Sequence, residues 1–350
     1  MKRTLYALAL LASATPYALA QGNVNIYGTF DGGVRKLTNS NAAGDSKLSA
    51  GSNGTYLANR LGFTGTEDLG GDNKIRFMLE SGFNTGTGAL DNANGVLFNR
   101  AAWVSVAGKW GSLMAGRQYT VAFAAARDYE PFTFRYISLI PVGGGAGTTL
   151  PAAAIAAGLG ASATSGTRFN NDLQYRLTTG PVTVMAEYAA GEQAGSVRNG
   201  AAQAVGLKYA EGPFNLGGAY TQKKTIAGQD NISWTAGGGY QLGDMIVKAG
   251  YSKERQQTPA AGTYANQLGW VGLLYQITPK VELAAAWYQT RYRHTATGER
   301  DFFIISCHYA LSKRSRLYVD LDRNLYRGAL VPATRQTGQT GITVGLSHSL

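Results

Sequence analysis

Residues 278–288 read TPKVELAAAWY, a short turn followed by a run with a period of two. The two parities of that run are Val281, Leu283, Ala285 and Trp287 on one side and Glu282, Ala284, Ala286 and Tyr288 on the other. Successive side chains of a β-strand point to opposite faces, so this pattern predicts a strand with two chemically different faces. The strand is expected to begin directly after the turn.

The same unit of turn and strand recurs along the chain. Gly, Pro, Asp and Ser mark seven short turns, near 67–70, 107–111, 178–181, 211–213, 242–244, 278–280 and 311–314. Longer polar segments alternate with them, near 35–52, 84–96, 120–166, 190–200, 222–230, 253–264, 291–300 and 323–339. These fifteen connections predict sixteen strands.

Short turns at one end of a sheet and long loops at the other are typical of an outer-membrane barrel. A soluble β-sandwich would show the same alternation of side chains. Aromatic residues favour the barrel, since many stand at or near predicted strand ends, where a girdle meets the lipid interfaces. They are Tyr188, Tyr209, Tyr220, Tyr240, Tyr251, Tyr275, Trp287 and Tyr309.

We therefore predict an all-β fold, a 16-stranded antiparallel transmembrane β-barrel. In lipid every backbone donor and acceptor needs a partner, so the sheet must close on itself. The strand over residues 24–30 is expected to pair with the one over 342–350.

The N-terminus has the layout of a secretory signal peptide. Lys2 and Arg3 precede an apolar run, and Ala18-Leu19-Ala20 offers small residues for cleavage before Gln21. We expect residues 1–20 to be removed and residues 21–350 to form one barrel domain. No later stretch of about 18 apolar residues predicts a transmembrane helix.

Composition narrows the function classes. The chain has 47 Gly and 20 Tyr, and its formal charge of +11 falls to +9 without Lys2 and Arg3. A basic excess suits nucleic acid, anionic membranes or anionic solutes, and export argues against nucleic acid. The single cysteine, Cys307, reads as a small apolar strand residue. We find no catalytic motif, His294, His308 and His348 are too scattered for a metal site, and no cofactor is expected.

Several stretches resemble the trimeric Gram-negative general diffusion porins, in particular the β-proteobacterial branch. The first strand, residues 23–28 with Asp31, and the run NRLGFTGTEDLG at 59–70 are similar to that family. The stretches 98–104, 116–118 and 309–314 continue the resemblance, which runs from Asn23 to the end. It implies a homotrimer in the outer membrane, in contact with lipid and lipopolysaccharide, whose water-filled lumen passes small hydrophilic solutes and ions.

The resemblance also implies a long third loop folded into the lumen and a constriction of charged residues. Arg60, Arg100 and Arg168 match the family's wall arginines, and Asp128 and Glu130 in DYEPF are candidates for the acids that face them. Alternation places Arg60 and Arg168 on the lumen side. Rings of Arg or Lys favour anions, so we expect a preference for anions.

Three more residues are possible members of the pore wall: Arg117, Lys248 and Glu282. Two departures from the family pattern are the C-terminal Leu350, where the family has an aromatic residue, and the Gly/Ala-rich segment from Gly143 to Gly166. That segment keeps open a substrate-specific channel for phosphate, a dicarboxylate or a sugar. A barrel that serves as an adhesin or anchor is the third alternative.

Overall fold

The computed structural model describes residues 23–52, 54–92, 95–142, 150–157, 159–160, 167–259 and 262–350. The Gly/Ala-rich segment noted above therefore lies largely outside the described residues. Within these ranges, no helix is long and apolar enough to cross a membrane.

The first half of the chain contains eight strands of the barrel, a short extra strand and two helices. In order they are β1 (Asn23–Leu37), β2 (Lys47–Ala50), β3 (Arg60–Gly70), β4 (Asn73–Gly82), β5 (Ala101–Gly108), β6 (Gly111–Tyr119), α2 (Val121–Tyr129), α3 (Ala152–Ala156), β7 (Arg168–Thr179), β8 (Val182–Ala189) and β9 (Ala202–Glu211).

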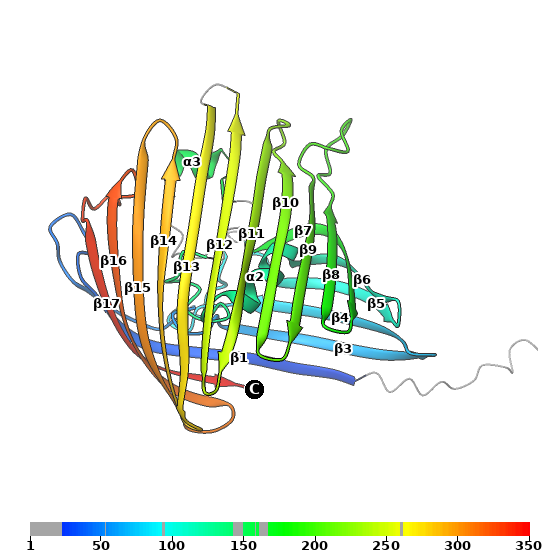
Figure 1. Ribbon diagram of the computed structural model, residues 1–350, viewed down its shortest axis with the longest axis horizontal. Coiled ribbons are helices and arrows are strands. Elements are labelled where there is room, and N and C mark those ends of the chain that lie inside the picture. The colour runs from blue at the N-terminus through cyan, green and yellow to red at the C-terminus, as the bar shows by residue number, and fades with distance from the viewer. Residues whose placement is uncertain are drawn as a thin grey trace, which may run out of the picture.

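The second half is a run of antiparallel strands that stand side by side in Figure 1. They are β10 (Phe214–Lys224), β11 (Asp230–Leu242), β12 (Met245–Thr258), β13 (Gly262–Thr278), β14 (Val281–Arg293), β15 (Thr297–Ala310), β16 (Ser315–Gly328) and β17 (Gly338–Ser349).

The sheet closes into an antiparallel barrel through β1. Residues 29–37 of β1 pair with 349–341 of β17, and on the other edge residues 23–29 pair with 66–60 of β3 and residues 34–37 with β2. Because β2 and β3 share one edge of β1, the ring has sixteen strand positions, as predicted.

The closing ladder lies further along β1 than the sequence suggested. Of residues 24–30, only Thr29 and Phe30 pair with β17, while the ladder continues to Leu37. Closing a barrel requires tilted strands with staggered register, so the two ends of a long strand pair with different neighbours.

Every barrel strand carries an exposed face and a covered face. On β17, Ile342, Val344 and Leu346 are exposed, whereas Thr343 and Ser347 between them are only 1% and 3% exposed. On β16, Val319 and Leu321 are exposed and Asp320 and Asp322 are buried. The exposed face is thus apolar, and the covered face carries most of the charged groups.

Three of the expected loops are shorter than the sequence suggested. The segments near 253–264 and 291–300 are largely strand, and nearly half of the segment near 323–339 is strand. β12 and β13 are separated only by residues 259–261. Polar residues continue the alternation there, with Glu254 and Gln256 covered and Arg255 exposed. A strand end with polar side chains on both faces has the sequence pattern of a loop, although its backbone remains paired with the neighbouring strands.

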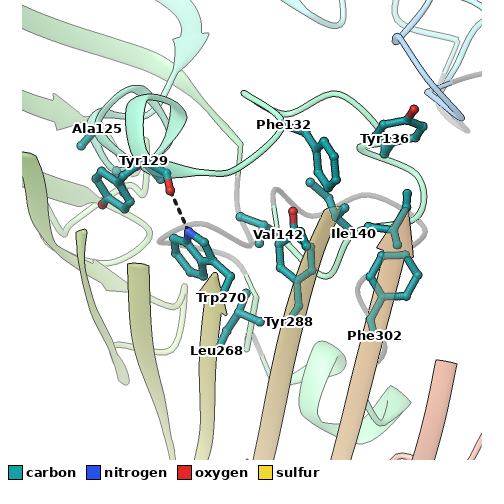
Figure 2. Packing of buried hydrophobic residues seen from close by; sticks show 14 of the residues in the cluster. Ala125, Tyr129, Phe132, Tyr136, Ile140, Val142, Leu268, Trp270, Tyr288 and Phe302 are labelled. Carbon is teal, nitrogen blue, oxygen red and sulfur yellow. Dashed lines mark hydrogen bonds between the residues drawn. The ribbon is translucent and has the colours of Figure 1, made fainter. Parts of the chain in front are cut away.

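The largest apolar cluster lies between the covered face and the chain from Val121 to Val142. Thr120 caps α2 by accepting a hydrogen bond from the Phe123 N–H at 3.1 Å. Figure 2 shows how the residues that follow α2 lie against strand side chains, with the Trp270 indole N–H donating to the Tyr129 carbonyl at 3.0 Å. Strand members of the cluster include Leu268, Trp270, Tyr288, Phe302 and Tyr318.

Candidate functional site

The three predicted arginines lie at the ends of alternate strands, and two of them bind one tyrosine. Arg60 and Arg168 are the first residues of β3 and β7, and Arg100 directly precedes β5. The hydroxyl of Tyr119, the last residue of β6, accepts hydrogen bonds from Arg100 at 3.0 Å and Arg168 at 2.7 Å. The Arg168 guanidinium also lies 4.3 Å from the centre of the Tyr119 ring.

Glu80 of β4 links the other side of this arginine cluster. Its carboxylate accepts from Arg100 Nε at 2.7 Å and lies 3.8 Å from Arg60. Tyr27 of β1 donates to the same carboxylate at 2.8 Å. One buried acid and a phenol oxygen therefore hold three like charges together. The sequence did not single out Tyr119, although it follows the family-like stretch 116–118.

The cluster members differ in their contact with solvent. The Arg60 side chain is 28% exposed, whereas the Arg100 and Glu80 side chains are 8% and 5% exposed. Arg100 also lies 3.5 Å from Asp91. The Arg60 guanidinium is therefore accessible to water, while Arg100 mainly contacts its neighbours.

The two predicted acids of the third loop contact other partners. Asp128, in α2, lies 2.5 Å from Lys208 of β9. Glu130, which follows α2, is fully buried and accepts from the Phe134 N–H at 2.6 Å and from the Tyr288 hydroxyl. Burial raises the pKa of the Glu130 carboxyl above its usual range. Asp128 and Glu130 thus connect the loop to β9 and β14, and their contacts do not include the arginine cluster.

Lys248 and Glu282 also connect this loop to the covered face. Lys248 Nζ donates to the Glu130 carbonyl at 3.1 Å and to Thr133 Oγ1 at 3.2 Å. Glu282 accepts from Arg135 at 2.7 Å and lies 2.9 Å from His308 Nδ1. Arg135 comes from the loop, and no sequence pattern indicated that it would meet a strand 147 residues away.

Arg117 lies beside a break in strand alternation. Its Nε donates to the Asn99 carbonyl at 2.6 Å, and it also donates to Asn170, which is exposed. The register of β6 and β7 shifts here, and Asn171 has a φ of 51°. The alternation from which Arg168 was placed on the lumen side is therefore broken at this bulge, where Phe169 is covered and Asn170 is exposed.

Among the residues described, no group of three or more His, Cys, Asp and Glu side chains is placed to hold a metal ion. The chemistry that this arrangement offers is electrostatic, from fixed charges on a closed barrel wall and on one loop.

Comparisons with known proteins agree with this architecture. The chain is 28% identical over its full length to outer membrane porin protein 32 of Delftia acidovorans, which it covers completely. It is 25% identical to the major outer membrane protein P.IB of Neisseria meningitidis, over 91% of this chain and 92% of that one. Among solved structures, an anion-selective porin from Comamonas acidovorans superposes with a TM-score of 0.79 at 23% identity, covering 94% of this chain and all of that one.

The family model described as Gram-negative porin matches residues 7–329, which is most of the chain. Family membership agrees with the sixteen strand positions, the apolar exposed face and the charged covered face. The chain therefore belongs to the Gram-negative porins.

Proposed function

We propose that this chain forms a water-filled channel in the outer membrane through which small hydrophilic solutes and ions diffuse passively, with a preference for anions. The exposed face meets lipid, and the covered face lines the lumen. Arg60, Arg100 and Arg168 are the basic wall residues of the channel, and Asp128 and Glu130 belong to the loop that narrows it. Arg117, Lys248 and Glu282 are further candidates for the wall.

One observation carries the preference for anions: acids and bases on the covered face differ in their exposure. Glu80, Glu130, Glu187, Asp172, Asp320 and Asp322 are all buried. Glu282 and Asp128 are partly exposed, but each lies beside a cation, Arg135 and Lys208 respectively. Arg60, Arg176 and Lys223 are partly exposed, and Arg76 is exposed. Water in the lumen therefore meets cations more than anions, which favours anions electrostatically.

Planar-bilayer recordings under a KCl gradient test the selectivity. We expect a reversal potential of the sign that indicates chloride as the more permeant ion. The opposite sign would refute the preference for anions and leave the channel function standing. The similar porin from Comamonas acidovorans is described as anion-selective, which supports the expectation.

The third loop is proposed to fold into the lumen and narrow it. This follows from the contacts of α2 with β8 to β12 and from the apolar cluster that the loop forms with the covered face. Trp270→Phe removes the hydrogen bond to the Tyr129 carbonyl and replaces the indole that stacks on the Tyr129 ring with a smaller ring. We expect noisier single-channel currents, because the loop loses an anchor.

Trp234→Phe is the matched control, since Trp234 is an exposed-face residue of β11. It should behave as the wild type. Identical current records for both variants would mean that the loop does not lie in the path of the ions.

Two further features complete the proposal. The mature protein begins at Gln21 after removal of residues 1–20, which mass spectrometry of the exported protein tests directly.

The mature protein assembles as a homotrimer in contact with lipid and lipopolysaccharide. One structural neighbour, an outer membrane protein of Vibrio cholerae, is described as a trimer form. Native mass spectrometry of the detergent-solubilised protein should give three times the mature mass.

A further inference from the structure

A group of cations stands on the exposed face at the end of the strands opposite the short turns. Backbone pairing places Lys253 of β12, Gln267 of β13 and Arg291 of β14 in one row across the sheet. The next row toward the strand ends contains Arg255, Ala265 and Arg293. Lys253, Arg255, Arg291 and Arg293 are called the cation row below.

Most of this charge is not neutralised by the protein. Arg291 lies 3.5 Å from Glu299 of β15, which Arg327 also approaches to 3.2 Å. In the described parts of the chain, Lys253, Arg255 and Arg293 form no ion pair with an acidic side chain. Three cations without acidic partners, two on β12 and one on β14 across β13, attract an anion with several negative oxygens.

An apolar groove begins directly beside the cation row. It encloses about 280 Å³ and is lined by Tyr251, Val271 and Trp287, with Gln267 and Arg291 at its polar end. Gly269 lies between Tyr251 and Gln289 in the sheet, and its missing side chain leaves the groove open. A second hollow of about 470 Å³ is lined by Arg255, Arg293 and His294. The surface is therefore apolar on the barrel side and cationic toward the strand ends.

The position of the cation row along the strands matches a membrane boundary. Ile277 is an exposed apolar residue next to the short turn, and Gln267 lies ten residues earlier on β13. A tilted strand needs about 9–11 residues to cross the hydrocarbon core. The row thus lies where lipid headgroups begin, at the end where the long loops of a porin face outward.

We propose that the cation row and this groove bind lipopolysaccharide, the phosphorylated and acylated glycolipid of the outer leaflet. Lys253, Arg255 and Arg293 bind a phosphate group, and one acyl chain lies along Tyr251, Val271 and Trp287 over Gly269. The inference rests on the proposed function because it takes the exposed face to meet lipid.

Titration of the detergent-solubilised native assembly with purified deep-rough lipopolysaccharide tests this site. The variant Lys253→Gln/Arg255→Gln/Arg293→Gln should bind it on the order of a hundredfold more weakly, since each basic residue contributes about fivefold. The matched control, Lys280→Gln/Lys313→Gln/Arg314→Gln, removes three cations at the short turns and should bind as the wild type. Enzymatically dephosphorylated lipopolysaccharide should bind the wild type weakly.

A second variant tests the groove without changing charge. A Cβ added at Gly269 meets only a Tyr251 ring atom at 3.7 Å, an ordinary contact, so Gly269→Leu should fold and fill the groove. It should weaken binding of the acylated lipid. Unchanged binding by the triple cation variant, or equal binding of the dephosphorylated lipid, would overturn the site.

Single-channel conductance separates this inference from the proposed function. The cation-row variants should conduct as the wild type does, because their side chains lie on the exposed face. Absence of channels in the wild type would contradict the proposed function, whereas the lipid titration reports on the site independently.

Discussion

At the scale of single residues, exposure separates Arg60, to which the proposed function assigns contact with ions, from Arg100, which is buried among its neighbours. Arg60 keeps a partly exposed guanidinium, while Arg100 is buried between Glu80, Asp91 and Tyr119. Sequence motifs identified both arginines equally well. The difference in exposure between Arg60 and Arg100 depends on which strands pair in the folded barrel. Substitutions of the two arginines should therefore have different effects.

Arg60→Gln should lower the permeability of chloride relative to potassium by roughly twofold to fivefold, because one unit charge a few ångströms from an ion in water contributes about 1 kcal/mol. Reversal potentials in a KCl gradient measure the change. Arg314→Gln, at a short turn, should leave the potential unchanged. An unchanged potential in the Arg60 variant would exclude this side chain from ion selection.

Arg100→Met should lower the free energy of unfolding by about 3–5 kcal/mol, because it leaves the buried Glu80 carboxylate without its main partner. Urea unfolding of the refolded protein in lipid vesicles measures the loss. Glu80→Met/Arg100→Met should lose less than Arg100→Met alone, since no uncompensated charge remains. A double variant that is less stable than the single one would contradict this role of the ion pair.

At the scale of elements, the segment from Val121 to Val142 is fixed to the strands by polar contacts as well as apolar packing. Glu130, Lys248, Arg135 and Glu282 form several of these contacts, and Glu130 accepts a hydrogen bond from a tyrosine 158 residues away in the chain. Of these, Glu130, Lys248 and Glu282 were predicted from family motifs and alternation, but as pore residues. Their anchoring role was not predictable, because no local pattern reports on a contact between distant segments.

Glu130 should make the stability of the packing between this segment and the strands dependent on pH. Burial raises the folded-state pKa of Glu130 above its unfolded value, so its contribution to stability is full below the unfolded pKa and is lost as the pH rises through the folded one. The protection factors of residues 121–136 in hydrogen exchange, corrected for the intrinsic pH dependence of amide exchange, should therefore rise on acidification.

Glu130→Gln should lose much of that pH dependence because the amide does not titrate. Lys248, Glu282, His308 and Tyr288 face this segment, and Arg135 lies within it. The comparison with Glu130→Gln therefore isolates the contribution of one carboxyl. An identical pH profile in the variant would assign the effect to those neighbours.

At the scale of the whole molecule, two faces and one closing ladder make the barrel. The exposed face is apolar on strand after strand, and β1 joins β17 to β3. Closure removes the free edges that an open sheet would present in lipid.

Val344→Arg places a charge in the middle of β17 on the exposed face. It should destabilise the folded barrel by about 2–4 kcal/mol if that face meets the hydrocarbon core. Urea titration in vesicles measures the change, and Leu311→Arg in a short turn should have little effect. Equal stability of the wild type and the Val344 variant would contradict the assignment of the exposed face to lipid.

Features that repeat locally were predictable from the amino-acid sequence alone. Alternation and turn residues predicted the all-β barrel and its sixteen strands, and short motifs identified Arg60, Arg100 and Arg168. The register of closure, the bulge at Asn171 and the partners of Asp128, Glu130 and Arg135 emerged only from the folded structure. The difference arises from distance along the chain: a strand pattern is set by neighbouring residues, whereas these contacts join segments that meet only after the barrel has closed.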